Sequence, residues 1–332
     1  MKKYILLFLF INFFSVANTQ VIKGTVYDEK TNSTIGFSSV YYNGTFVGTT
    51  SDLNGYFEFN SSINTSMPLT FSAIGYYSFN LTKFSLDKPL KIYLKPKEYE
   101  LKETVIKSRS LETKRKKNLI LFKYEFLGTT DNAQKCKILN EQDITFNYGS
   151  DKDTLKAFAS KPILIDNTAL GYKITYYLDK FEYYKRKDAT FFSGNIIFTE
   201  NETSVEKQKQ FYESRKYAYL GSRMHFFRAL WADSLKTTKF SVANSKYTNL
   251  NYKDLVSQDS KNNYYLQYPG ELRVVYTTRV SDIDFLKKYV FFNKNGYFDP
   301  TGINWLGKMG DQRIAEWLPY EYSIDSLTVT SR

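Results

Sequence analysis

Residues 43–59 read NGTFVGTTSDLNGYFEF, where turn signals alternate with short runs of strand-forming residues. Asn43-Gly44 is a dipeptide that accepts positive φ at both central positions of a type I′ hairpin turn. Asp52-Leu53-Asn54-Gly55 is a second turn sequence. The stretch therefore predicts a strand over residues 45–50, after the first turn, and another over residues 56–59, after the second.

Short strand-forming segments of the same kind lie on both sides of this stretch. They cover residues 21–27, 37–42, 69–74, 77–81 and 90–94. Together with the strands at 45–50 and 56–59 they make seven short strands. Turn signals at intervals of about 8–12 residues are typical of a β-sandwich. We therefore predict a sandwich domain over residues 20–97.

Glycines and turn residues recur in this domain at spacings that resemble a known family. The matching residues are Gly24-Thr25-Val26-x-Asp28, Gly44-Thr45-x-x-Gly48, Asp52-x-x-Gly55-x-Phe57 and Gly75-Tyr76. They resemble the carboxypeptidase regulatory-like domain. The resemblance implies a transthyretin-like, seven-strand sandwich. It implies no peptidase activity, because these domains are non-catalytic partners of zinc peptidases.

The resemblance also implies a cellular location. Such domains are common at the N-termini of Gram-negative envelope proteins, including TonB-dependent nutrient receptors. Leu101-Lys102-Glu103-Thr104-Val105-Ile106 is similar to a short segment that often follows the domain in those receptors. One hypothesis that follows is an accessory of outer-membrane nutrient uptake.

The N-terminus has the pattern of a secretory signal. Lys2 and Lys3 precede an apolar run over residues 4–16, and Ser15-Val16-Ala17 places small residues at the cleavage positions. The run is too short for a bilayer, which requires about 20 residues. We predict a signal peptide over residues 1–17 and an exported protein, periplasmic or associated with the outer membrane, with no membrane span in the mature chain.

The chain is basic, and its formal net charge of +12 falls to +10 when Lys2 and Lys3 are removed with the signal. Because the predicted location is outside the cytoplasm, we expect no nucleic acid partner. Part of the charge lies in a run that begins at Lys107 and ends at Lys117. We assign residues 98–118 to a basic, solvated linker, and the alternative is a patch for an anionic surface.

The remaining residues, 119–332, mix strand and helix patterns. Strand patterns cover residues 144–148, 154–159, 162–165, 171–184, 190–198, 264–268, 271–279 and 289–292. Helical patterns cover residues 131–139, 204–217, 222–234 and 311–318, the last with Asp311 as its cap. The whole chain is therefore predicted to be mainly β, with the sandwich followed by an α+β domain that has an antiparallel sheet and a few short helices.

The residue counts exclude the common hydrolytic and metal centres. One His and one Cys cannot supply a two-His zinc centre or a Cys-based metal cluster. His225, between Met224 and Phe226 beside an apolar helix face, is typical of a packed core residue, and Cys136 of a small buried hydrophobe. The sequence has no nucleophile elbow, phosphate loop or dinucleotide fingerprint. We predict no enzyme and no catalytic, metal or cofactor residues.

Carboxylates leave an alternative open. The C-terminal stretch contains Asp282, Asp284, Asp311, Glu316 and Glu321. Glycosidases need only two carboxyl groups at a set separation. A hydrolase of this kind, with its site in the second domain, is therefore the alternative hypothesis.

Aromatic residues suggest a binding role. The chain has 29 Tyr, and aromatic rings stack on sugar faces and are frequent at interfaces. We name Tyr176, Tyr183, Tyr264 and Trp231 as candidate ligand-binding residues; a half-buried antiparallel sheet is the alternative explanation for the tyrosines. The predicted function is an exported, non-catalytic envelope protein that binds a protein, peptide or glycan.

Overall fold

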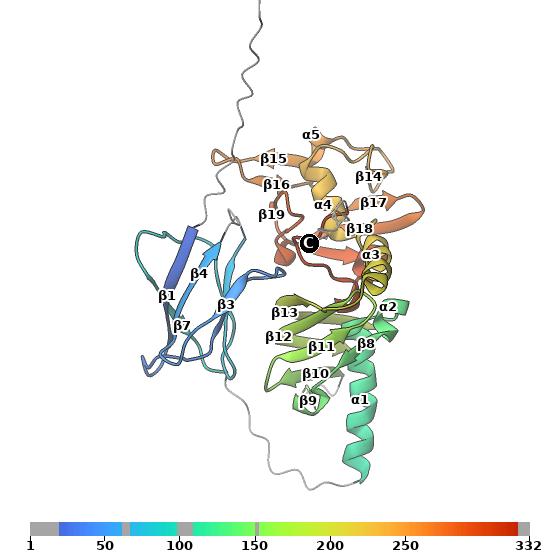
Figure 1. Ribbon diagram of the computed structural model, residues 1–332. Helices are drawn as coiled ribbons and strands as arrows, with labels where there is room; N and C mark the ends of the chain where they lie inside the picture. Colours follow the sequence, from blue (N-terminus) through green and yellow to red (C-terminus); the bar gives the residue numbers. More distant parts are fainter. Residues whose placement is uncertain (1–19, 62–66, 98–108, 150–152, 325–332) are drawn as a thin grey trace, which may run out of the picture.

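The computed structural model describes residues 20–61, 67–97, 109–149 and 153–324 (Figure 1). The chain forms a β-sandwich and then a larger α+β domain, which Figure 1 shows side by side. The predicted signal peptide, the receptor-like segment at 101–106 and the first part of the predicted linker lie outside the described residues.

The first domain is a β-sandwich, as predicted. Its described residues form sheets with the strand orders β4-β1-β7 and β3-β2-β5-β6. The strands are β1 (Gln20–Asp28), β2 (Ser39–Tyr42), β3 (Gly48–Thr50), β4 (Tyr56–Ser61), β5 (Leu69–Ser72), β6 (Phe79–Leu81) and β7 (Leu90–Leu94).

Both turns of the opening stretch lie where the sequence places them, but Asn43 does not adopt the positive φ of a type I′ turn, and the strand expected from residue 45 begins only at Gly48. Gly44 has a φ of +78° and Gly55 a φ of +76°, left-handed values that glycine adopts without strain. The carboxylate of Asp52 accepts hydrogen bonds from the N–H groups of Asn54 and Tyr56 at 2.9 and 2.8 Å. The sheets then close over a shared apolar core. Its members include Ile22, Val26, Val40, Phe57, Leu69, Phe71, Ile92 and Leu94.

The second domain begins with helix α1 (Arg109–Leu127), whose buried residues pack against a six-stranded antiparallel sheet. The central strand, β12, pairs with β13 along its whole length, and its other edge pairs with β11 and then β10. The strands are β8 (Cys136–Ile138), β9 (Ile144–Tyr148), β10 (Thr154–Ala159), β11 (Ile163–Asn167), β12 (Tyr172–Tyr184) and β13 (Ala189–Glu200).

Two smaller sheets share a second core with helix α4 (Arg223–Trp231). The sheet β14-β17-β18-β20 contains β14 (Phe240–Asn244), β17 (Leu272–Tyr276), β18 (Arg279–Phe285) and β20 (Ile303–Leu306). The sheet β15-β16-β19 contains β15 (Val256–Gln258), β16 (Tyr264–Leu266) and β19 (Val290–Phe292). The other α-helices described are α2 (Asp131–Gln134), α3 (Val205–Tyr219), α5 (Tyr252–Leu255) and α6 (Gly307–Gly310), and short 3-10 helices cover Glu141–Asp143, Pro300–Gly302 and Ile314–Glu316. No helix of the described residues has the length and apolar character needed to cross a bilayer.

The assignment of residues 98–118 to a linker is wrong for its second part, because residues 109–118 belong to α1. The basic run is rich in Lys and Arg, which are good helix formers. Phe122 and Phe126, both fully buried, anchor the second half of the helix on the sheet. The α+β domain therefore begins earlier than the sequence suggested.

Three other predictions need correction. The helix expected over 131–139 ends at Gln134, because the residues that follow pair with β11 as strand β8. The strand expected over 271–279 is a hairpin, because Thr277 has a φ of +53° and the chain reverses there between β17 and β18. Asp311 is the C-cap of α6 and does not begin a helix.

The sandwich contacts the second domain through its first turn. The N–H of Gly44 donates to the carbonyl oxygen of Ile196 in β13 at 2.8 Å, and the N–H of Tyr320 donates to the carbonyl of Gly44 at 2.8 Å. The side-chain oxygen of Asn43 accepts a hydrogen bond from the N–H of Ile196 at 2.8 Å. The turn therefore pairs with an edge strand of the large sheet.

Polar side chains lie beside this contact. Asp179 occupies a β-bulge of β12, where the register with β13 shifts between Leu178 and Lys180. Lys97 of the sandwich donates to the carbonyl oxygen of Leu178 at 3.0 Å. Burial raises the pKa of Asp179 and lowers the pKa of Lys97. The domain boundary therefore partly shields both an acid and a base from solvent.

Candidate ligand-binding site

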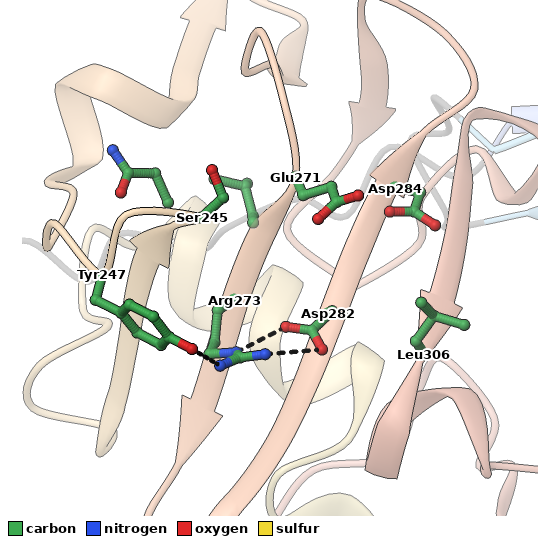
Figure 2. Close-up of a pocket in the computed structure, with 9 residues that line it drawn as sticks. Ser245, Tyr247, Glu271, Arg273, Asp282, Asp284 and Leu306 are labelled. Atoms are coloured by element: carbon green, nitrogen blue, oxygen red, sulfur yellow. Dashed lines mark hydrogen bonds and ion pairs between the residues drawn. The ribbon is translucent and has the colours of Figure 1, made fainter.

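A cavity of about 200 Å³ opens on the solvent-facing side of the sheet β14-β17-β18-β20 (Figure 2). Strands β17, β18 and β20 and the end of β14 with its following loop contribute the lining. The lining residues are Asn244, Ser245, Tyr247, Glu271, Leu272, Arg273, Asp282, Asp284 and Leu306. Most of these side chains are polar, and the ring of Tyr247 is 71% exposed. The cavity is therefore accessible to a dissolved ligand.

Strand alternation explains which side chains reach the cavity. Leu272 of β17 and Ile283 of β18 are fully buried in the core below the sheet. Their neighbours Arg273, Asp282 and Asp284 consequently point to the opposite, solvent-facing side. The antiparallel register places Arg273 directly across from Asp282.

The loop after β14 presents Tyr247 to the same place. The side-chain oxygen of Asn244 accepts hydrogen bonds from the N–H groups of Lys246 and Thr248, both at 3.0 Å. This is an Asx turn. Tyr247 itself has a φ of +60°, a left-handed conformation that the turn maintains.

Arg273 is held from two directions (Figure 2). Its Nε donates to Oδ1 of Asp282 at 2.9 Å, and its Nη1 donates to the hydroxyl of Tyr247 at 3.0 Å. The guanidinium also lies 5.2 Å from the centroid of the Tyr247 ring, within cation–π range. The Asp282 partner raises the pKa of Arg273. The guanidinium is thus a fixed, permanent cation in the cavity wall.

The cavity has more acidic than basic groups. Glu271 is exposed, and Asp284 accepts a hydrogen bond from the side-chain amide of Asn304 at 3.4 Å. With Asp282, these carboxylates give the lining an excess of two negative charges over Arg273. Acceptors and donors are both present, so the site suits a polar ligand, and its charge disfavours an anionic one.

The carboxylates predicted for a hydrolase do not all gather here. Asp282 and Asp284 line the cavity. Asp311, Glu316 and Glu321 cap a helix or accept hydrogen bonds in other parts of the fold. A hydrolase that uses Asp282 and Asp284 remains the alternative hypothesis.

The predicted aromatic residues lie in two different regions of the second domain. Tyr176 is 1% exposed and belongs, with the half-buried Tyr183, to the core of the six-stranded sheet. Tyr264 packs, partly buried, against the second core, and the exposed Trp231 lies beside it with 5.7 Å between the ring centroids. The structure does not bring these four residues into one groove. Sequence reasoning missed Tyr247, which was the aromatic residue at the cavity.

His225 is a packed core residue, as its sequence context indicated. Its ring is 7% exposed and contacts three aromatic rings. The N–H of Gly221 donates to its Nδ1 at 3.1 Å, and burial lowers its pKa to about 4. Burial raises the pKa of Cys136 to about 12. Within the residues described, no three His, Cys, Asp or Glu side chains are grouped to hold a metal ion.

Comparison with known proteins identifies the first domain. Residues 22–106 match the family model of the CarboxypepD_reg-like domain, which agrees with strands β1 to β7 and with the glycine spacing. No curated protein matches the chain, and no family model matches its C-terminal region. The chain therefore contains an N-terminal carboxypeptidase regulatory-like domain, followed by an α+β domain that forms the cavity around Arg273.

Proposed function

We propose that this chain is an exported, non-catalytic binding protein of the cell envelope, and that the cavity around Arg273 binds a glycan. The observation that carries the proposal is the position of Arg273, which is fixed between Asp282 and Tyr247 in a solvent-open cavity. A guanidinium held in this way loses little conformational entropy when a ligand binds.

The other lining residues support a carbohydrate as the ligand. Sugar hydroxyls donate hydrogen bonds to carboxylates such as Glu271 and Asp284, and Asn244 and Ser245 can both donate and accept. The exposed ring of Tyr247 offers an apolar face for a sugar ring. The excess negative charge favours a neutral or amine-bearing glycan over an acidic one.

The sandwich then has a supporting role. It pairs with β13 through the Gly44 turn, and Asp179 and Lys97 lie partly buried at the boundary. These contacts involve β12 and β13 and not the strands that line the cavity. Export is supported by the basic and apolar pattern of residues 1–17, which lie outside the described part of the chain.

Titration calorimetry with neutral oligosaccharides tests the proposal. Cellohexaose, maltohexaose, mannohexaose and chitohexaose are suitable probes. We expect at least one to bind, and we expect Tyr247→Ala and Glu271→Gln to weaken that binding by about tenfold or more, since each removes a direct contact.

Tyr217→Ala is the matched control. Tyr217 is 67% exposed and lies 5.0 Å from the guanidinium of Arg279, so it resembles Tyr247 but does not line the cavity. The proposal fails if no probe binds or if Tyr217→Ala weakens binding as much as Tyr247→Ala. Shortened oligosaccharides after incubation would instead support the hydrolase alternative, with Asp282 and Asp284 as its carboxylates.

A further inference from the structure

Helix α1 extends past the sheet that anchors it (Figure 1). Its fully buried side chains, such as Phe122 and Phe126, belong to the second half of the helix. In the first half, Arg115 is the inward-facing residue, and its guanidinium donates to the carbonyl oxygen of Glu141 at 2.7 Å. The side chains of residues 111–114, 116 and 117 are exposed.

Exposed apolar and basic residues share one side of α1. Ile120 and Tyr124 are 67% and 59% exposed. Lys116 and Lys117 precede Ile120 by four and three residues, which places all four side chains on one helix face. Lys114 is exposed at the flank of that face. We name Lys114, Lys116, Lys117, Ile120 and Tyr124 the basic face of α1.

Little negative charge offsets this face. Glu112 lies 3.6 Å from Lys116, and both side chains are about 70% exposed, so this pair is well solvated and weak. Within the described residues, no ion pair is formed by Lys114 or Lys117. The basic face is therefore a positive surface that contains two accessible apolar side chains.

We infer that the basic face of α1 binds an anionic membrane surface. Lysines close to anionic headgroups each strengthen binding by about fivefold. Tyr is enriched at the headgroup level of bilayers, and Ile gains from leaving water. A nucleic acid or an acidic loop would neutralise the lysines but would leave Ile120 exposed, so the mixture of residues favours a lipid surface. The inference is independent of the cavity around Arg273, which lies on other elements.

Co-sedimentation with lipid vesicles tests the inference. The purified chain is mixed with phosphatidylcholine vesicles that contain or lack phosphatidylglycerol. We expect binding only to the anionic vesicles, with an affinity that decreases as salt is added. The variant Lys114→Gln/Lys116→Gln/Lys117→Gln should bind at least about tenfold more weakly.

A matched variant controls for total charge. Lys207→Gln/Lys209→Gln/Lys253→Gln removes the same charge from exposed lysines on α3 and α5, and we expect it to bind like the original chain. Ile120→Ser/Tyr124→Ser should weaken binding while leaving its dependence on salt unchanged. Circular dichroism establishes that each variant is folded.

Three results would overturn the inference. They are no binding to phosphatidylglycerol vesicles, equal losses in both lysine variants, and unchanged binding of Ile120→Ser/Tyr124→Ser. The last result would point to a purely electrostatic partner such as an acidic protein or a nucleic acid.

Discussion

The phenol of Tyr177 in β12 and the hydroxyl of Ser39 in β2 share a hydrogen bond of 2.7 Å across the domain boundary. The ring of Tyr177 stacks on Tyr41 with 5.9 Å between centroids, and the hydroxyl of Tyr41 is hydrogen-bonded to Ser72 at 2.9 Å. Both phenols at the boundary thus have polar partners. Losing a partner there leaves a desolvated hydroxyl unpaired, which is costly.

Replacing Tyr177 by Phe keeps the ring and removes its hydroxyl. We expect the free energy of unfolding to fall by about 1 kcal/mol, because Ser39 loses its partner. Ser39→Ala should have a similar effect, and the double variant should lose little more than either single one. Urea unfolding measures all three. If the double variant loses the sum of the two single losses, the hydrogen bond between Tyr177 and Ser39 does not contribute to stability.

Gly44→Ala should disturb the contact between the domains. A Cβ at Gly44 would lie 2.7 Å from Cε2 of Tyr320, and the residue has a φ of +78°. We expect a loss of about 2–4 kcal/mol from the combined clash and backbone strain. Thermal unfolding is a suitable measurement.

Gly75→Ala separates the two causes of that loss. Gly75 has a φ of +86°, but a Cβ there meets no heavy atom within 4 Å. This variant should lose only the strain, about 1 kcal/mol. If both alanines cost the same, the contact with Tyr320 contributes nothing.

Acid should destabilise the fold through His225. Its pKa is about 4 in the folded chain, below the ordinary value of 6.5, so between these values the unfolded state binds more protons. Stability is therefore unaffected by this group above pH 6.5 and falls as the pH is lowered toward 4. The difference between the two pKa values corresponds to a loss of about 3 kcal/mol in the free energy of unfolding.

The variant His225→Gln tests this pH dependence. Its free energy of unfolding should change less between pH 7 and pH 4 than that of the original chain. Urea unfolding across that pH range measures both. It should also leave binding at the cavity intact, because His225 does not line it. Identical pH curves for the two proteins would refute the assignment.

Arg228 organises the C-terminal segment that contacts the sandwich. Its guanidinium donates to the carbonyl oxygens of Asn295, Tyr322 and Tyr320 at 3.0, 2.7 and 3.0 Å. A lysine cannot reproduce this planar set of donors. We expect Arg228→Lys to cost about 2–3 kcal/mol and to speed hydrogen exchange at the N–H of Tyr320.

A surface arginine provides the comparison for Arg228→Lys. Arg186 is 85% exposed and lies 3.6 Å from Asp153. Arg186→Lys should change stability by less than about 0.5 kcal/mol. If both variants lose similar free energy of unfolding, the hydrogen bonds of Arg228 to the three carbonyls contribute no more to stability than a surface ion pair.

The sandwich was predictable because its turns are encoded locally. Gly44, Gly55 and the side chain of Asp52 determine their own backbone geometry, so the strands between them follow from short-range sequence. The long strands β12 and β13 were also apparent, because their aromatic and β-branched residues extend over many positions.

Other elements depend on contacts that a sequence does not display. The start of α1 is polar and has no apolar period, and the helix is fixed by Phe122 and Phe126 further along the chain. The turn at Thr277 places a β-branched residue at positive φ, which local propensity disfavours. Tertiary packing decides both cases.

The candidate site was predicted only in part, for the same reason: Asp282 and Asp284 were named as candidate carboxylates, whereas Arg273 and Tyr247 were not named. Arg273 and Asp282 become neighbours only when the hairpin between β17 and β18 is known. With the turn placed at Thr277, strand pairing alone would have brought these opposite charges together. Tyr247 could not have been found in this way, because a loop delivers it to the sheet.

The Asn43-Gly44 turn limits how this sandwich can be combined with other domains. Its backbone groups are already paired with Ile196 and Tyr320. A chimera that replaces the sandwich must keep that turn and a partner for Tyr177, or the backbone of β13 at Ile196 loses its hydrogen-bond partners. We therefore expect the two halves of the chain to be inherited together, as one unit, rather than exchanged as separate modules.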